Sequence, residues 1–151
     1  MNLHTRKILH LDLDAFFCAV EELRDPSLAG KAFAVGGKPG QRGVVSSCSY
    51  PARRRGVHSA MPTGQALQLC PELILISSNF GDYSTKSDGV MEILHDLSGL
   101  VEQISVDEAF VDVTDLPQEA EQIARSLQQR VKKETGLPCS IGVASNKLVA
   151  K

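Results

Sequence analysis

Two short apolar runs, followed by one long amphipathic run, constrain the fold of this chain more than any other feature. Each short run is too short for a helix, and the segment 106–108 between them is short enough for the two runs to pair as a hairpin. The long run carries Ile123, Leu127 and Val131 at every fourth position, which is typical of a helix with one buried face. In chain order we expect a strand at 101–105, a strand at 109–113, a helix at 118–135 and a strand at 139–144.

The N-terminal part supplies the first strand and helix of the same fold, at residues 8–12 and 15–23. Together these elements give β-α followed by β-β-α-β, the order of a split βαβ, ferredoxin-like sheet. We therefore expect an α+β fold whose mostly antiparallel sheet carries helices on one face. Residues 1–24 and 79–151 would form this domain, and residues 25–78 a smaller inserted one. The other expected elements are strands at 31–35 and 73–77, a hairpin loop at 36–43, helices at 50–55, 62–69 and 80–97, and a last helix capped by Ser145.

Charge and cysteine content narrow the class of protein. Lysine and arginine number 16 against 18 aspartate and glutamate, for a formal net charge of −2, whereas a protein that binds nucleic acid by electrostatics alone is expected to be basic. Contact with DNA would therefore come from local patches, from parts of a longer chain or through metal ions. The four cysteines form no CxxC pair, and no apolar run reaches the ~18 residues of a membrane span. We expect a soluble, cytoplasmic protein with reduced thiols.

Acidic residues follow two of the expected strands. Asp12 ends the first strand, and Asp107-Glu108 lie in the hairpin turn, at the same end of the predicted sheet. Carboxylates brought together in this way repel one another unless divalent cations bind, and oxygen ligands favour Mg²⁺ or Mn²⁺ over zinc. Two such ions would clamp the attacking and leaving oxygens of a phosphoryl transfer. A plainer interpretation is also open, in which Asp12 or Asp14 caps the following helix and Asp107-Glu108 form a solvated turn.

Four segments of the sequence are similar to motifs of a known protein family. They are, in order, ILHLDLDAFFCAVEEL, SYPARRRGVHSAMPTGQALQLCP, ISVDEAFVDVT and SIGVASNKLVAK. Together they resemble the Y-family DNA polymerases, and among these the DinB, or DNA polymerase IV, branch. The resemblance runs from about Lys7 to Lys151. It implies that the ferredoxin-like domain is a palm and the inserted domain a small fingers subdomain.

By position, this resemblance assigns catalysis and metal binding to Asp12, Asp107 and Glu108, with Leu13 as a metal ligand through its backbone carbonyl alone. The implied cofactor is a pair of Mg²⁺ ions, with Mn²⁺ as a substitute. Asp12 and Asp107 would bridge both ions. Glu108 would act on the ion nearer the primer 3′-hydroxyl.

The resemblance also implies a nucleotide site. Phe17 would be the steric gate, an aromatic ring that leaves no room for a 2′-hydroxyl, with Phe16 in the core or the pocket wall. Tyr50 and Arg53 lie three residues apart, one helical turn, so they can address one ligand. The implied contacts to the triphosphate come from Ser47, Tyr50, Arg53 and Lys151.

The implied activity is that of a DNA-directed DNA polymerase of the translesion type, which adds deoxynucleotides to a primer 3′ end, releases pyrophosphate and copies damaged templates at low fidelity. Primer-template DNA and deoxynucleotides are the implied partners, together with a sliding clamp for the full-length, monomeric protein. The thumb and little-finger domains of the family are expected to be missing here, so residues 1–151 alone would be weak or inactive. Two alternatives stay open: an inactive polymerase-like module in a DNA-damage mutagenesis complex, and a nucleotidyl cyclase with the same palm, against which Phe17 argues.

Overall fold

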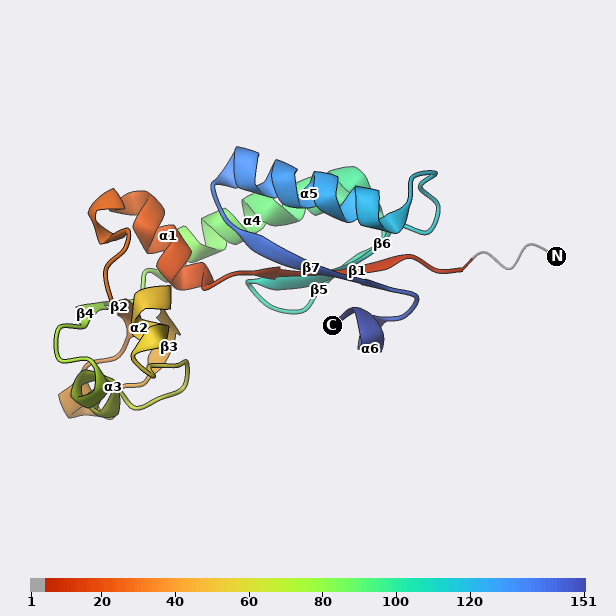
Figure 1. Cartoon of the computed structure of the whole chain (residues 1–151). Helices are drawn as coiled ribbons and strands as arrows, with labels where there is room; N and C mark the ends of the chain where they lie inside the picture. Colours follow the sequence, from red (N-terminus) through yellow and green to blue (C-terminus); the bar gives the residue numbers. More distant parts are fainter. Residues whose placement is uncertain (1–4) are drawn as a thin grey trace. The chain divides into compact units, whose positions relative to one another are not determined.

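The computed structural model describes residues 5–151, which divide into two compact units (Figure 1). The first unit consists of the described residues up to Asp14 together with Ser84–Lys151, and the second of Ala15–Tyr83. None of the helices in residues 5–151 is both long and apolar enough to cross a membrane.

A four-stranded antiparallel sheet forms the first unit. Its strand order is β5 (Val101–Gln103), β6 (Glu108–Asp112), β1 (Ile8–Leu13) and β7 (Cys139–Ala144). The strand β1 pairs antiparallel with both β6 and β7, and β5 with β6 forms the expected hairpin. This is the order of a ferredoxin-like sheet, so the predicted fold class is confirmed.

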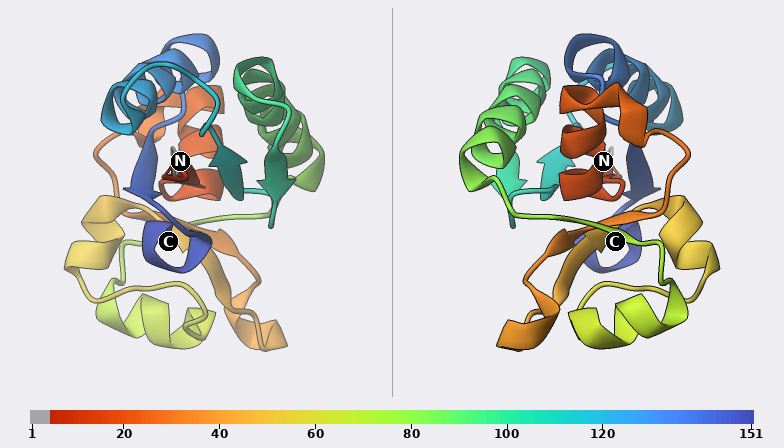
Figure 2. Two further views of the ribbon diagram at one scale, coloured as in Figure 1. Left: turned by 90° about the vertical axis from the view of Figure 1, so that its right-hand side faces the viewer. Right: turned by 90° about the vertical axis from the view of Figure 1, so that its left-hand side faces the viewer.

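One face of this sheet is covered by two long helices. Side chains alternate along β1, and Leu9, Leu11 and Leu13 are all buried. Because Ile8 packs with Phe110 and Ala150 on the opposite face, alternation assigns these leucines to the face over which α4 (Phe80–Leu97) and α5 (Ala120–Thr135) lie (Figures 1 and 2). The apolar stripe of α5 and the leucines of β1 therefore form the core of the first unit.

The opposite face is only partly covered, by the short helix α6 (Lys147–Ala150). Ile8, Phe110 and Ala150 form a small buried apolar cluster there. Gly142 of β7 lies directly against the backbone of α6, since a Cβ at this position would clash with the Ala150 carbonyl oxygen. Glycine therefore permits α6 to dock this closely.

The second unit contains a three-stranded sheet with β2 (Phe33–Gly36) at its centre. It pairs antiparallel with β3 (Val45–Cys48), which confirms the predicted hairpin, and parallel with β4 (Ile74–Ile76). The chain between the parallel strands β2 and β4 contains β3 and two helices, which is enough to return it to the same end of the sheet before β4 begins. The helical segments of this unit are α1 (Phe16–Arg24), η1 (Pro26–Leu28), η2 (Pro39–Gln41), α2 (Tyr50–Arg54) and α3 (Thr63–Leu69), besides the start of α4.

Neither the alternative helix cap at Asp14 nor the expected cap at Ser145 is present. The residue before α1 is Ala15, in the left-handed conformation at φ 43° and without a side-chain cap, and Asp14 instead accepts a hydrogen bond of 2.7 Å from Ser140 Oγ. The helix α6 is capped by Asn146, whose side chain accepts a backbone N–H from the first turn, and not by Ser145. Serine and asparagine are both good helix caps, so the cap of α6 is decided by the position at which the helix begins.

The unit boundaries also differ from the predicted ones. Residues 15–24 and 79–83 group with the second unit, in which α1 packs against β2 and β3. The assignment of residues 1–24 and 79–151 to a palm and of residues 25–78 to fingers stays a prediction. Residues 1–4, which that prediction includes, lie outside the described residues.

Candidate active site

The register of β1 against β6 places acidic residues from distant parts of the chain at one end of the sheet. Asp12 and Glu108 are direct cross-strand partners. The backbone N–H of Leu13 donates a hydrogen bond of 2.9 Å to the carbonyl of Asp107, which fixes the turn beside the end of β1. Asp12, Asp107 and Glu108 therefore lie together on the first unit and form one acidic cluster.

Glu108 is held by two basic side chains. His10 Nε2 donates a hydrogen bond of 2.9 Å to Glu108 Oε1, and His10 is only 5% exposed. Lys151 Nζ lies 3.5 Å from the same oxygen. The hydrogen bond from His10, and then the charge of Lys151, lower the pKa of Glu108 in spite of its partial loss of hydration. Glu108 is therefore ionised at neutral pH.

The pKa of Asp12 is shifted in the opposite direction from that of Glu108. Its side chain is exposed, yet partial loss of hydration at the sheet surface raises its pKa, and the nearby Asp107 and Glu108 raise it further. The carboxylate of Asp107 accepts a hydrogen bond of 2.8 Å from Ser105 Oγ. A cation bound between these groups would relieve the repulsion at Asp12.

The donor set fits a hard divalent cation, because it consists of the carboxylates of Asp12, Asp107 and Glu108 and the backbone carbonyl of Leu13, all oxygen. The side chains do not form a closed cage, since no group of three acidic, histidine or cysteine residues within 5–151 is arranged to hold an ion. Glu108 is engaged with its two basic partners instead. Binding of a cation would require Glu108 to turn from at least one of them.

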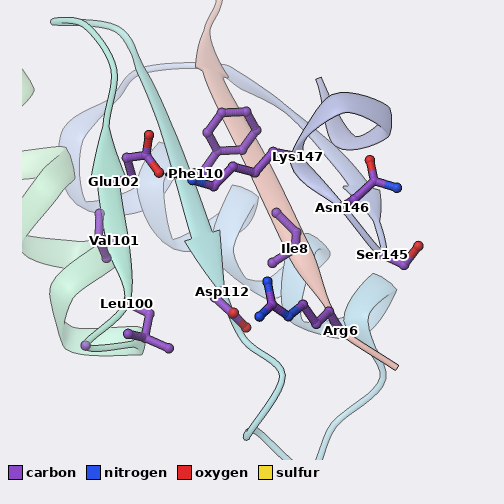
Figure 3. Close-up of a pocket in the computed structure, with 11 residues that line it drawn as sticks. Arg6, Ile8, Leu100, Val101, Glu102, Phe110, Asp112, Ser145, Asn146 and Lys147 are labelled. Atoms are coloured by element: carbon purple, nitrogen blue, oxygen red, sulfur yellow. Dashed lines mark hydrogen bonds and ion pairs between the residues drawn. The ribbon is translucent and has the colours of Figure 1, made fainter. Parts of the chain in front are cut away.

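A cavity of about 660 Å³ lies further along the same open face (Figure 3). Phe110 lies at one end of it, with the ammonium of Lys147 5.7 Å from its ring centroid. Lys147 is also paired with Glu102, and Arg6 lies beside Asp112 at the other end. The charges that line this cavity are thus balanced locally, and the cavity does not include the acidic cluster.

Phe16 and Phe17 begin α1 in the second unit but have different surroundings. Phe16 is 3% exposed, as expected for a core residue. Phe17 is half-buried, and its ring stacks on that of Tyr83 with centroids 4.3 Å apart and an interplanar angle of 15°. Phe80 meets Phe17 edge-on at 6.0 Å. One side of the Phe17 ring is therefore fixed by the first turn of α4.

The helix α2 presents Tyr50 and Arg53 together in the second unit. Tyr50 is 53% exposed, and the Arg53 guanidinium lies 5.1 Å from the centroid of its ring. Arg53 Nε also donates a hydrogen bond of 3.2 Å to the Cys48 carbonyl. Ser47, in contrast, is buried, and its Oγ has no hydrogen bond of ordinary geometry within the described residues, although the Cys18 thiol lies beside it.

Sequence reasoning missed two functional contacts. His10 precedes Asp12 by two residues in a strand, so the alternation of side chains could have placed both on one face. The stacking of Tyr83 on Phe17 had no local signal, because the two residues belong to different helices far apart in the sequence.

The fold is similar to those of solved DNA polymerases. An insertion ternary complex of Dbh DNA polymerase matches 95% of this chain and 44% of its own chain, with a TM-score of 0.89 and 31% sequence identity. A crystal structure of DinB from Sulfolobus solfataricus matches 95% of this chain and 43% of its own, with a TM-score of 0.90 and 31% identity. These likenesses define the class of protein as that of the Y-family DNA polymerases, as the sequence motifs predicted.

Residues 11–151 match the impB/mucB/samB family, and the chain belongs to this family. DNA polymerase IV of Francisella philomiragia is 49% identical over 150 residues, which cover 97% of this chain and 43% of that protein. DNA polymerase IV of Protochlamydia amoebophila is 49% identical over 149 residues, with the same shares of 97% and 43%. The chain therefore spans less than half the length of these relatives.

Proposed function

We propose that this chain is the nucleotidyl-transfer part of a DNA-directed DNA polymerase of the translesion type. The observation that carries the proposal is the strand register that sets Asp12 opposite Glu108, with Asp107 alongside, in a member of the impB/mucB/samB family. The relatives named DNA polymerase IV support the same activity. Primer-template DNA and deoxynucleoside triphosphates are the proposed substrates of a cytoplasmic, monomeric enzyme that engages a sliding clamp.

Y-family DNA polymerases use divalent metal ions, and we infer two Mg²⁺ ions here, for which Mn²⁺ can substitute. Asp12, Asp107 and Glu108 would hold them, with the backbone carbonyl of Leu13. When bound, the ions supply positive charge at the reacting oxygens and lower the pKa of the primer 3′-hydroxyl. His10 holds Glu108 Oε1 by a hydrogen bond of 2.9 Å, so it would orient this carboxylate at the edge of the acidic cluster.

The reaction forms a bond between the primer 3′ oxygen and the α-phosphorus of the nucleotide while the bond to pyrophosphate breaks. Tyr50 and Arg53 share one surface of α2, where a hydroxyl and a planar guanidinium can bind phosphate oxygens. Lys151 and Ser47 complete the proposed triphosphate contacts. Lys151 would exchange its contact with Glu108 for one with the phosphates. The buried Ser47 hydroxyl, which makes no hydrogen bond of ordinary geometry within residues 5–151, would gain a phosphate oxygen as a partner.

Phe17 is the proposed steric gate, with Phe16 behind it in the core. A half-buried ring stacked on a buried tyrosine presents a firm surface to the sugar of the nucleotide. It would exclude a 2′-hydroxyl by shape and so favour deoxynucleotides.

The experiment is primer extension by the protein over its full natural length, with Asp107→Asn against the wild type. This change keeps the size of the side chain but removes its charge, so we expect extension to fall by at least ~10²-fold while circular dichroism and urea unfolding stay close to those of the wild type. Asp115→Asn is the matched control, since Asp115 is an exposed aspartate outside the acidic cluster, and it should extend normally.

Retention of full extension by Asp107→Asn would refute the assignment. Isothermal titration of the wild type with Mg²⁺ and a deoxynucleotide addresses the alternative of an inactive module, which should bind no nucleotide in a metal-dependent way. A preference for ribonucleotides in the same titration would point to a cyclase.

A further inference from the structure

We propose that Glu21 is a positioning residue for the ring of Phe17, acting through Tyr83, and that it thereby contributes to the selection of deoxynucleotides over ribonucleotides. This inference rests on the proposed function, in which Phe17 is the steric gate. All three residues lie within the second unit.

The first step is the contact between the two rings. Tyr83 is 0% exposed and stacks on Phe17 almost in parallel, at 4.3 Å and 15°. Phe80 closes the edge of both rings, at 6.0 Å from Phe17 and 6.0 Å from Tyr83. The position of the Phe17 ring is therefore set by where the ring of Tyr83 is held.

The second step is the anchor of Tyr83 at its polar end. The Tyr83 hydroxyl donates a hydrogen bond of 2.8 Å to Glu21 Oε1, and Glu21 is itself only 4% exposed. Glu21 follows Phe17 by four residues in α1, so their side chains lie on the same side of that helix. Two residues on one face of α1 therefore contact Tyr83: Phe17 stacks on its ring, and Glu21 accepts the hydrogen bond from its hydroxyl.

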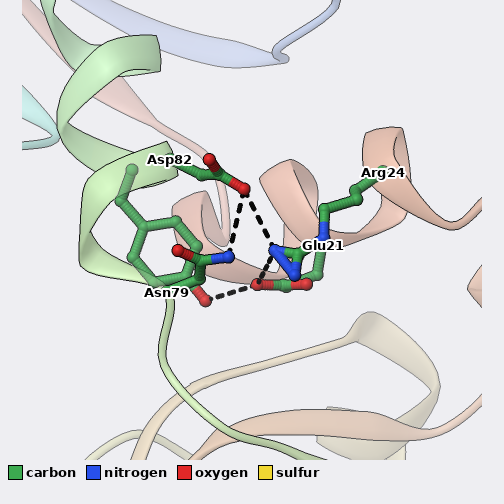
Figure 4. A network of polar contacts seen from close by, with 5 residues as sticks. Glu21, Arg24, Asn79 and Asp82 are labelled. Carbon is green, nitrogen blue, oxygen red and sulfur yellow. Dashed lines mark hydrogen bonds and ion pairs between the residues drawn. The ribbon is translucent and has the colours of Figure 1, made fainter.

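The third step concerns the buried carboxylate. Arg24 Nη1 lies 3.7 Å from Glu21 Oε1 and 3.0 Å from Asp82 Oδ2, and Asn79 Nδ2 donates a hydrogen bond of 3.1 Å to the same Asp82 oxygen (Figure 4). This network ties the end of α1 to the first turn of α4, beside Tyr83. Burial, together with the nearby Glu21, raises the pKa of Tyr83, so its hydroxyl stays a donor at neutral pH.

A buried carboxylate is a costly way to fill space, because it must be desolvated, whereas an apolar side chain would pack without that cost. The carboxylate fixes the orientation of the Tyr83 side chain, since the hydroxyl must point at one oxygen of Glu21. A gate that acts by shape depends on such a fixed orientation, because a displacement of its ring by a fraction of an ångström opens space beside the sugar.

The experiment measures kcat/KM for a deoxynucleotide and for the matching ribonucleotide in the full-length protein. Tyr83→Phe removes only the hydroxyl, whereas Glu21→Leu removes its acceptor together with the ion pair to Arg24. We expect each to lower the ratio of the two kcat/KM values by about 10-fold, mainly through faster use of the ribonucleotide. Glu21→Gln keeps an acceptor oxygen in the same place and should stay within about twofold of the wild-type ratio.

Leu94→Ala is the matched control for destabilisation, since Leu94 is a fully buried residue of α4 in the first unit. It should lower the Tm without changing the ratio, whereas a purely structural role of Glu21 would make Glu21→Leu behave in the same way. If Glu21→Leu does not fold, Tyr83→Phe still tests the inference, because it removes a single atom.

Phe17→Ala separates this inference from the proposed function. If Phe17→Ala collapses the ratio while Tyr83→Phe and Glu21→Leu leave it within twofold, the positioning role is wrong and the gate stands. If Phe17→Ala leaves the ratio unchanged, Phe17 is not the gate and the positioning role fails with it. If the wild type uses no deoxynucleotide, the proposed function itself is wrong. An equal loss of the ratio in Leu94→Ala would also overturn the inference.

Discussion

Replacement of His10 by phenylalanine should cost the fold the hydrogen bond that holds Glu108. The phenylalanine ring keeps the packing that His10 makes with Phe110, at 5.0 Å between centroids. Hydrogen bonds to charged groups contribute about 1.5–3 kcal/mol. The side chain of Glu108 is 22% exposed and keeps Lys151 as a partner, so part of this contribution is recovered. We expect the free energy of unfolding to fall by about 1 kcal/mol at pH 7.

The pH dependence gives the same prediction a second readout. The pKa of Glu108 in the folded chain is lowered from its ordinary value of 4.5, chiefly by the hydrogen bond from His10. A lowered carboxyl pKa stabilises the fold at pH values above the unfolded pKa, and this stabilisation is lost as the pH falls through the folded pKa. The difference between the wild type and His10→Phe should therefore narrow as the pH falls below 4.5 and through the lowered pKa of Glu108.

Urea unfolding at a series of pH values, followed by circular dichroism, measures both effects. His95→Phe is the matched control, since His95 lies on the exposed side of α4, and it should unfold like the wild type at each pH. An unchanged midpoint for His10→Phe at pH 7, or a deficit that does not narrow at any pH below 4.5, would contradict the reasoning.

Two further predictions concern packing. Gly142→Ala should force α6 away from β7, because the new Cβ would meet the Ala150 carbonyl, and urea unfolding should show a loss of about 1–3 kcal/mol; Gly64→Ala, which has open space around it, should show no such loss. Burial raises the pKa of the thiols of Cys18 and Cys139 to about 11, and all four cysteines are buried and free, so iodoacetamide at pH 8 should label the native chain very slowly and the urea-unfolded chain at all four sites by mass spectrometry. Rapid labelling of the native chain would contradict this second prediction.

The order of the strands could be predicted because hydrophobic periodicity and short connections determine it. The apolar runs around 106–108 had to pair locally, and the helix at 118–135 had to return the chain across the sheet. Once β6 lies beside β1, alternation of side chains decides which carboxyl groups share a face. These rules predicted that Asp12 and Glu108 lie at the same end of the sheet, but they placed Glu108 in the turn, whereas it is the first residue of β6 and pairs directly with Asp12.

The contacts around the site could not be predicted in the same way. The hydrogen bond between His10 and Glu108 depends on rotamers chosen in the packed sheet, and the support of Phe17 by Tyr83 depends on how two distant helices pack. The left-handed Ala15 contradicts local propensity, which favours glycine there, so only the surrounding structure can impose it. Local rules thus predicted which residues are present at the site, and tertiary packing determined how they are held.

The pairing of Asp12 with Glu108 has a consequence for how this sheet tolerates insertions and deletions. Neighbouring residues of β1 point to opposite faces, so a single added or lost residue in that strand would rotate the aspartate toward the leucine-lined interior and bring a leucine outward. Such a shift would scatter the acidic cluster even if every hydrogen bond of the sheet re-formed. The catalytic chemistry proposed for this protein therefore depends on the exact number of residues in β1.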